Sequence, residues 1–206
     1  DQRMANAKSG AWWEDHQQRA LSNNSVAYTE TPEIGAFLKE WVSLYESKSG
    51  ERDMFNRQAA ERQAAKNGRR EEYKDYGTNP CSEIILRNKQ FCNLTEVVIR
   101  ATDTLKSLAH KVRLATILGT IQSTYTKFPY LRKVWQTNTE EERLLGVSLT
   151  GIMDNPLTNG KAKGLDKTLE YLRDVAIETN KEWSGTLGVQ QSTSITCVKP
   201  SGTVSQ

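Results

Sequence analysis

Apolar residues recur at helical spacing in three long segments of the chain, which predicts three amphipathic helices. The first segment covers residues 33–47 and the longest covers residues 102–124. The third covers residues 165–183. In each of them the apolar positions fall three or four residues apart, so they form a stripe that can face a core.

Two further stretches have helical features without a long apolar stripe. Residues 55–66 are rich in Ala and Gln and predict a helix, which the sequence Asn-Gly-Arg-Arg at residues 67–70 interrupts. Residues 138–142 place Asn and Thr before three consecutive Glu residues. A capping side chain followed by acidic residues is typical of a helix start, so a helix is predicted to begin there.

Short runs rich in β-branched residues lie between the predicted helices. Residues 145–149 predict a buried strand, and residues 192–198 predict a strand that leads into Pro200. Residues 96–100 fit either a short strand or a turn into the longest helix. The mixture of long helices and short strands predicts an α/β fold.

The segment before the longest helix carries the residues best suited to chemistry. Asn79, Cys81 and Glu83 stand at alternate positions. In an extended segment such side chains point to one face, roughly 6–7 Å apart, so all three can face one small substrate. Pro80 cannot donate to a sheet ladder and favours an extended loop over a central strand. Cys92 follows Cys81 by eleven residues, and a second thiol within reach would make the chemistry redox.

Each of these residues also has a purely structural interpretation. Cys81 fits a buried, inert cysteine, and Glu83 fits a solvated glutamate. Asn79 before a proline is a common turn former. A disulfide or a metal site between Cys81 and Cys92 is a further alternative, although the spacing fits no standard zinc pattern. The two histidines stand in no ligand motif, so no metal site is predicted.

Composition limits the classes of protein to consider. The 206 residues are 36% hydrophobic and 26% charged with a net charge of +3, which fits one globular domain or part of a larger one. The charge is too weak to indicate nucleic-acid binding. No apolar run approaches the roughly 20 residues that a membrane span needs. Three cysteines do not suggest a secreted disulfide framework, so a reducing cytoplasm is expected.

The two ends of the chain predict a fragment. Asp1-Gln2-Arg3-Met4 shows neither a signal-peptide pattern nor an initiator Met at position 1, and Val204-Ser205-Gln206 forms no polar tail. Both ends are expected to be cuts through a longer protein, and the chain alone is expected to be inactive and poorly stable.

Motifs along nearly the whole chain resemble one known family, the catalytic chains of ribonucleotide reductases. The resemblance is closest to the adenosylcobalamin-dependent (class II) enzymes of the monomeric, triphosphate-reducing type. The blocks that carry it, in the family's order, are residues 21–28, 49–51 with 55–57, 77–81, 119–122, 140–148 and 199–205.

The resemblance implies a fold and a role for each site residue. The fold would be part of a ten-stranded α/β barrel whose central finger loop carries the radical cysteine, with residues 1–206 as a piece of that catalytic domain. Cys81 would be the thiyl radical that abstracts the 3′-hydrogen, Glu83 the general base and Asn79 the amide that holds the ribose hydroxyls. Cys92 would be one of two thiols that become a disulfide, with its partner upstream of residue 1. Cys197 matches no such motif and is expected in the core.

The last residues resemble the family's phosphate-binding segment. Small hydroxyls and backbone N–H groups in a glycine turn can bind an anion, and the residues concerned are Ser201, Gly202, Thr203, Val204 and Ser205. Taken alone, Pro-Ser-Gly is chiefly a turn signal. The chain has neither a P-loop nor a dinucleotide-binding glycine motif. The polar residues 22–25 fit either a substrate contact or a plain loop.

The resemblance also implies a cofactor and partners. Adenosylcobalamin would bind outside this chain or at its edge. The substrate would be a ribonucleotide, with a nucleotide effector and a thioredoxin-like or other dithiol reductant, and no nucleic acid or membrane partner. Two alternatives stay open: the large subunit of a class I ribonucleotide reductase, and a non-catalytic α/β nucleotide-binding module whose cysteines are structural.

Overall fold

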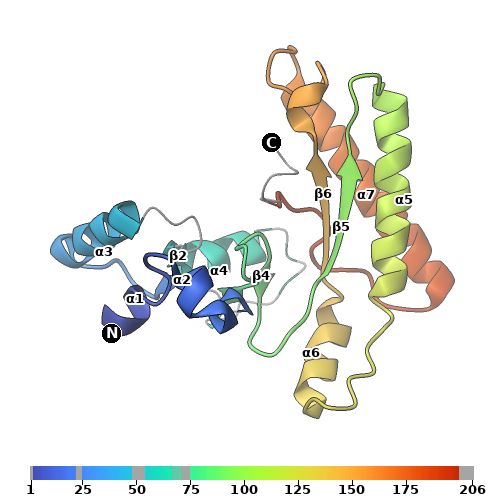
Figure 1. Cartoon of the computed structure of the whole chain (residues 1–206). Helices are drawn as coiled ribbons and strands as arrows, with labels where there is room; N and C mark the ends of the chain where they lie inside the picture. The colour runs from blue at the N-terminus through green and yellow to red at the C-terminus, as the bar shows by residue number, and fades with distance from the viewer. Residues whose placement is uncertain are drawn as a thin grey trace. The chain divides into compact units, whose positions relative to one another are not determined.

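The computed structural model describes residues 2–21, 25–47, 54–66, 68, 70 and 75–199. Helices and strands alternate along the chain, which confirms the predicted α/β class (Figure 1). The chain divides into two compact units, Asp1–Asn88 and Lys89–Gln206. Within the described ranges, no helix is both long and apolar enough to cross a membrane.

The second unit is built on two parallel strands, β5 (Asn93–Val98) and β6 (Leu145–Thr150). They pair without a break from Asn93 opposite Leu145 to Val98 opposite Thr150. A further extended segment runs parallel to β6 along its other edge, where Val147 N–H donates to the Ile195 carbonyl at 2.9 Å. Parallel strands buried on both faces favour continuous apolar and β-branched runs, and β6 has this composition.

Three helices accompany these strands: α5 (Leu105–Gln122), α6 (Lys133–Glu142) and α7 (Leu165–Leu187), with a short 3-10 helix, η2 (Ile152–Asp154). The start of α5 is fixed by a capping box, in which Ser107 N–H donates to Thr104 Oγ1 at 3.2 Å and Thr104 N–H donates to Ser107 Oγ at 2.9 Å. Arg143 then ends α6 in the left-handed region, with φ of 43°.

The core of this unit lies where α5 and α7 pack side by side against the two strands (Figure 1). Burying these aliphatic side chains is the main favourable term in folding the unit. The buried members are Val97, Ile99, Leu108, Val112, Ala115, Leu145, Val147, Leu172, Ala176 and Ile195.

The first unit consists of short elements. Its helices are α1 (Gln2–Ala5), α2 (Trp12–Asp15), η1 (Gln17–Leu21, a 3-10 helix), α3 (Ile34–Ser47) and α4 (Arg57–Ala65). Its strands are β1 (Val26–Tyr28), β2 (Met54–Asn56), β3 (Gly77–Thr78) and β4 (Ile85–Leu86). β1 pairs with β2 in parallel, and β3 pairs with β4 antiparallel. Its buried core is small and holds Ala60, Ala64 and Tyr76.

Several expectations for the elements are confirmed, and others differ. Helices α3, α5 and α7 occupy the three predicted stripes, and β6 is the predicted buried strand. The predicted helix start at residues 138–142 is wrong, because these residues form the end of α6. Residues 96–100 lie partly in β5, which begins three residues earlier at Asn93. The predicted strand at 192–198 is reduced to a single bridge at Thr196.

Candidate functional site

The Asn79–Glu83 motif forms a tight turn between β3 and β4. Asn79 Oδ1 accepts a hydrogen bond from Ile84 N–H at 3.0 Å, and the Asn79 carbonyl accepts one from Ser82 N–H at 3.0 Å. Ser82 adopts a φ of +62°, in the left-handed region. The expected extended segment with three side chains on one face is therefore wrong. Pro80 removes an N–H from the ladder and favours a turn, which the Asn79 side chain closes.

The turn presents a thiol and partly shields a carboxylate. Cys81 follows Pro80 in the turn, and its side chain is exposed rather than buried in a core. Glu83 is half-buried, and its Oε2 atom is shielded from solvent. Thr78 Oγ1 and Ser82 Oγ lie 3.4 Å apart across the base of the turn. The turn thus offers a nucleophilic or radical-bearing sulfur two residues from a group that can take up a proton.

Contacts from the small core hold the hairpin that carries this turn. The Arg70 guanidinium donates to the Ile85 carbonyl at 3.0 Å and lies 4.8 Å from the centroid of the Tyr76 ring. Arg57 Nε donates to the Tyr76 carbonyl at 3.0 Å. Tyr76 is fully buried against Ala60 of α4. The hairpin therefore depends on one aromatic residue and two arginines.

Cys92 lies in the second unit, immediately before β5, and is half-buried. The next residue, Asn93, donates both its backbone N–H (2.9 Å) and its side-chain Nδ2 (3.1 Å) to the Leu144 carbonyl. The thiol thus stands one residue before the first hydrogen-bonded position of β5. No disulfide joins Cys81 and Cys92.

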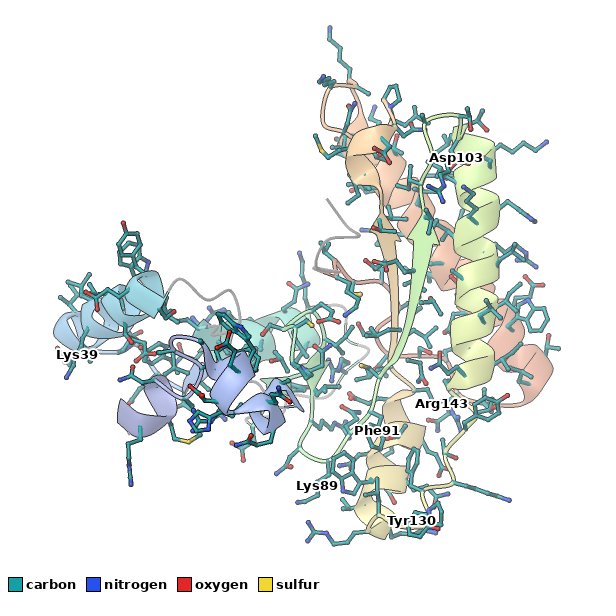
Figure 2. All side chains as sticks on the ribbon, viewed as in Figure 1. Lys39, Lys89, Phe91, Asp103, Tyr130 and Arg143 are labelled. Carbon is teal, nitrogen blue, oxygen red and sulfur yellow. The ribbon has the colours of Figure 1, made fainter. Side chains whose placement is uncertain are left out.

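Residues before Cys92 contact α6, and sequence analysis did not single them out. Gln90 is buried and donates to Glu142 Oε2 at 2.6 Å and to the Asn138 carbonyl at 3.0 Å. Figure 2 shows the neighbouring Phe91 beside α6, where its ring lies 4.8 Å from that of Trp135. The sequence feature that could have pointed to Gln90 and Phe91 is their position directly before Cys92.

Cys197 is half-buried and belongs to neither thiol site. Its backbone N–H donates to the Val147 carbonyl at 3.1 Å. Together with Val112, Leu149 and Leu172 it lines a cavity of about 420 Å³ between β6 and the helices. The expectation that Cys197 lies in the core is thus met only in part, because the cavity leaves one side of it open.

Electrostatic contacts that shift pKa values lie away from the thiols. Lys111 Nζ donates to Asp103 Oδ2 at 2.6 Å beyond the carboxyl end of β5, and this bond lowers the pKa of Asp103 to about 2 (Figure 2). On α6, hydrogen bonds from Thr126 (2.6 Å) and Gln136 lower the pKa of Glu140. In the described part of the chain, His, Cys, Asp and Glu side chains gather nowhere in the threes or more that a metal site would need.

The predicted phosphate segment, Ser201–Ser205, lies outside the described residues, as do Ser22–Asn24. The described chain reaches Lys199, whose backbone N–H donates to Ser148 Oγ of β6 at 3.0 Å. The approach to the predicted segment is therefore fixed against the sheet.

Comparison with known proteins finds relatives of one kind. No family model matches the chain. It is 29% identical over 155 residues to the adenosylcobalamin-dependent ribonucleoside-triphosphate reductase of Lactobacillus leichmannii, covering 63% of this chain and 21% of that protein. For the enzyme of the same name from Lactobacillus acidophilus the identity is 31%, covering 63% and 20%. For that of Lacticaseibacillus paracasei it is 27%, covering 93% and 28%.

A solved structure shares the fold. The crystal structure of a B12-dependent (class II) ribonucleotide reductase superposes with a TM-score of 0.59 at 24% identity, over 98% of this chain and 31% of that one. These matches confirm the resemblance that the sequence motifs predict. The chain spans about a fifth to just over a quarter of the length of the curated relatives it matches.

Proposed function

We propose that this protein takes part in the radical reduction of ribonucleoside triphosphates to 2′-deoxyribonucleotides, as part of an adenosylcobalamin-dependent ribonucleotide reductase. The observation that carries the proposal is the β3–β4 turn, which places an exposed Cys81 two residues from the partly shielded Glu83 in a chain that has the fold of such an enzyme. The names and organisms of the curated relatives support the substrate class.

In the proposed reaction the turn residues act on the ribose. Cys81, as a thiyl radical, takes the hydrogen atom from C3′, which costs little because S–H and activated C–H bonds are similar in strength. Glu83 accepts the 3′-hydroxyl proton while the 2′-hydroxyl leaves as water. The Asn79 side chain closes the turn through Ile84 N–H, so it acts by holding Cys81 and Glu83 in register and by hydrogen bonding to the ribose hydroxyls.

Cys92 supplies the electrons in this proposal. Cys92 and a second thiol together give up two electrons and two protons and become a disulfide. The C2′ position gains a hydrogen, and one water is released, so the reaction balances. A thioredoxin-like or other dithiol then reduces the disulfide. A reaction that depends on the reduced thiols of Cys81 and Cys92 fits a reducing compartment such as the cytoplasm.

The cavity in the second unit does not fit adenosylcobalamin. The cavity of about 420 Å³ in the second unit has the size of a site for a drug-sized molecule. A corrin cofactor is several times larger, and no histidine lines the cavity. In this proposal the cofactor binds outside this chain or at its edge, and the nucleotide effector binds outside it.

The remaining assignments follow the same proposal. The 206 residues would be a piece of a ten-stranded barrel, with the β3–β4 turn as its finger loop. The parallel arrangement of β5, β6 and the segment at Ser194–Cys197 supports this. Ser201, Gly202, Thr203, Val204 and Ser205 would bind the substrate phosphates.

The test is a turnover assay of the protein at its encoded length with ribonucleoside triphosphate, adenosylcobalamin and a dithiol. We expect Cys81→Ser to abolish deoxynucleotide formation, because an O–H bond is much stronger than an S–H bond and serine cannot cycle as the radical. Cys197→Ser is the matched control and should keep most of the activity. Undiminished reduction by the Cys81→Ser protein would refute the proposal.

A further inference from the structure

The residues that precede Cys92 pack against one face of α6. Trp135, Asn138, Thr139 and Glu142 recur at helical spacings of three and four residues, so they share one face of the helix. We call these four residues the α6 clamp. Each of them contacts the segment Lys89–Phe91. Residues 89–91 and α6 are about 50 positions apart in sequence, so these contacts belong to the tertiary structure.

The hydrogen bonds of the α6 clamp fix three consecutive residues. Asn138 Nδ2 donates to the Lys89 carbonyl at 3.3 Å, and Phe91 N–H donates to Thr139 Oγ1 at 3.3 Å. Gln90 Nε2 has two hydrogens, and it donates to both Glu142 and the Asn138 carbonyl. The Gln90 amide nitrogen therefore has no donor left for any other partner.

The aromatic contact fixes the same segment from a second direction. The Phe91 ring lies 4.8 Å from the Trp135 ring and 5.0 Å from the Phe128 ring, within the range for interacting aromatic pairs. On the other side of the thiol, Asn93 is tied to the Leu144 carbonyl by two hydrogen bonds. Cys92 thus lies between two anchored neighbours, Phe91 and Asn93.

Glu142 stands where local rules disfavour it. Its side chain is only 2% exposed, and burial disfavours a carboxylate. It also lies at the carboxyl end of α6, where a negative charge opposes the helix dipole. Residues that break local rules often serve a function instead of stability. Its contact with Gln90, two residues before the thiol, indicates what that function is.

We propose that the α6 clamp positions the Cys92 thiol, with Gln90 and Glu142 as positioning residues. A disulfide needs its two sulfurs about 2 Å apart at a defined dihedral angle, so a thiol that must repeatedly form one benefits from a fixed backbone. This role rests on the proposed function, in which Cys92 delivers electrons. It adds Gln90, which lies outside the motifs that carry the resemblance, and it gives Glu142 a role.

The test measures the alkylation rate of each cysteine by iodoacetamide, resolved by peptide mass spectrometry. Gln90→Met keeps the side-chain volume but removes two hydrogen bonds. We expect it to raise the Cys92 rate roughly thirtyfold, because each of the two lost bonds contributes about 1 kcal/mol to holding the segment closed. Thr139→Val removes one bond and should raise it roughly fivefold. The rate at Cys197 should not change in either variant.

Gln122→Met is the matched control, since Gln122 is exposed at the end of α5 and should leave all rates unchanged. Unchanged Cys92 rates in both clamp variants would overturn the proposal. An equal rise in the alkylation rate of Cys197 would also overturn it, because it would show that the whole unit has become less rigid. At encoded length, Gln90→Met should lower kcat for repeated turnover and leave KM unchanged. If the wild type reduces no nucleotide, the proposed function fails, while the alkylation rates still decide whether α6 holds Cys92.

Discussion

The two candidate redox thiols stand on very different supports. Cys81 is exposed on a turn between two-residue strands, and the core beneath it has three buried residues among those that the structure describes. Cys92 precedes a six-residue strand in a unit whose core has ten. A group that must approach a substrate carbon gains from exposure on a turn, whereas a group that must meet another sulfur gains from rigidity. In the proposed function, Cys81 thus has the exposure, and Cys92 the rigid support, that their roles would need.

Hydrogen bonds of polar residues also differ between the units that support Cys81 and Cys92. In the unit that contains Cys92, buried amides tie separate elements together: Asn155 donates to the carbonyls of Arg100 (2.8 Å) and Asp103 (2.9 Å), and Asn180 joins α5 to the segment after α7. Around Cys81 the comparable ties are the arginine contacts to the hairpin. A satisfied buried amide fixes its neighbours because every alternative arrangement leaves polar groups unpaired.

The largest effect is expected at Tyr76, the fully buried aromatic residue under the Cys81 hairpin. Tyr76→Ala should cost about 3–5 kcal/mol, because a large cavity replaces the ring in a core that has little else to fill it. Hydrogen exchange of the α4 and β3–β4 amides measures this. Tyr45→Ala is the control, since Tyr45 is 71% exposed. Protected hairpin amides in the Tyr76→Ala protein would show that the hairpin has another source of stability.

A smaller loss is expected at Asn180, on the Cys92 side of the comparison. Asn180 is fully buried, donates to Thr120 Oγ1 (3.0 Å) and Ser192 Oγ (3.1 Å), and accepts from Ser192 N–H (3.0 Å). Asn180→Ala leaves these groups without that partner and should cost about 2–3 kcal/mol in denaturant unfolding. Gln190→Ala, at an exposed position, should stay within about 0.5 kcal/mol of wild type. Equal losses of unfolding free energy in the two variants would show that buried amides do not stabilise this unit more than exposed ones.

The sequence predicted the parts of this comparison that depend on local pattern. The stripes of α5 and α7 and the β-branched run of β6 have periods that reveal their structure directly. The start of α6 was missed because Lys133–Thr137 has no apolar stripe, so the acidic residues at its end looked like a start. For Asn79 the motif and the resemblance predict a role that stays a prediction, whereas its turn geometry depends on a bond to Ile84 that the sequence did not reveal.

Most of the structural features that the sequence pattern did not predict depend on contacts between residues far apart in sequence. Gln90 is unremarkable in sequence, and its partner Glu142 lies 52 residues away. A buried glutamate is also contrary to the usual fate of this residue type. The same holds for Asn155 and Asn180, whose partners are distant carbonyls and hydroxyls. Such residues become visible only when the chain is folded, because single-sequence propensities carry no information about partners.

The smallest effect is expected at the other end of the strand that Cys92 precedes, and it depends on pH. The Lys111 hydrogen bond lowers the pKa of Asp103 from 3.8 to about 2, with further bonds from Ser107 Oγ (2.8 Å) and Arg100 N–H (2.8 Å). A carboxyl whose pKa is lower in the folded state stabilises the fold when it is ionised. Its contribution is therefore fully present above about pH 4 and is lost as the pH falls through about 2.

Comparing the unfolding free energy of wild type with that of Asp103→Asn isolates this contribution, since other carboxyl groups titrate in both proteins. We expect a difference that is constant at neutral pH and shrinks between about pH 4 and pH 2. Lys111→Met should flatten the same part of the profile, because it removes the main cause of the lowered pKa of Asp103. A difference that persists unchanged at pH 2 would mean that the Asp103 side chain stabilises the start of α5 by shape and neutral hydrogen bonding. The rigidity of the Cys92 unit would then owe nothing to this ion pair and would rest on its core and its buried amides.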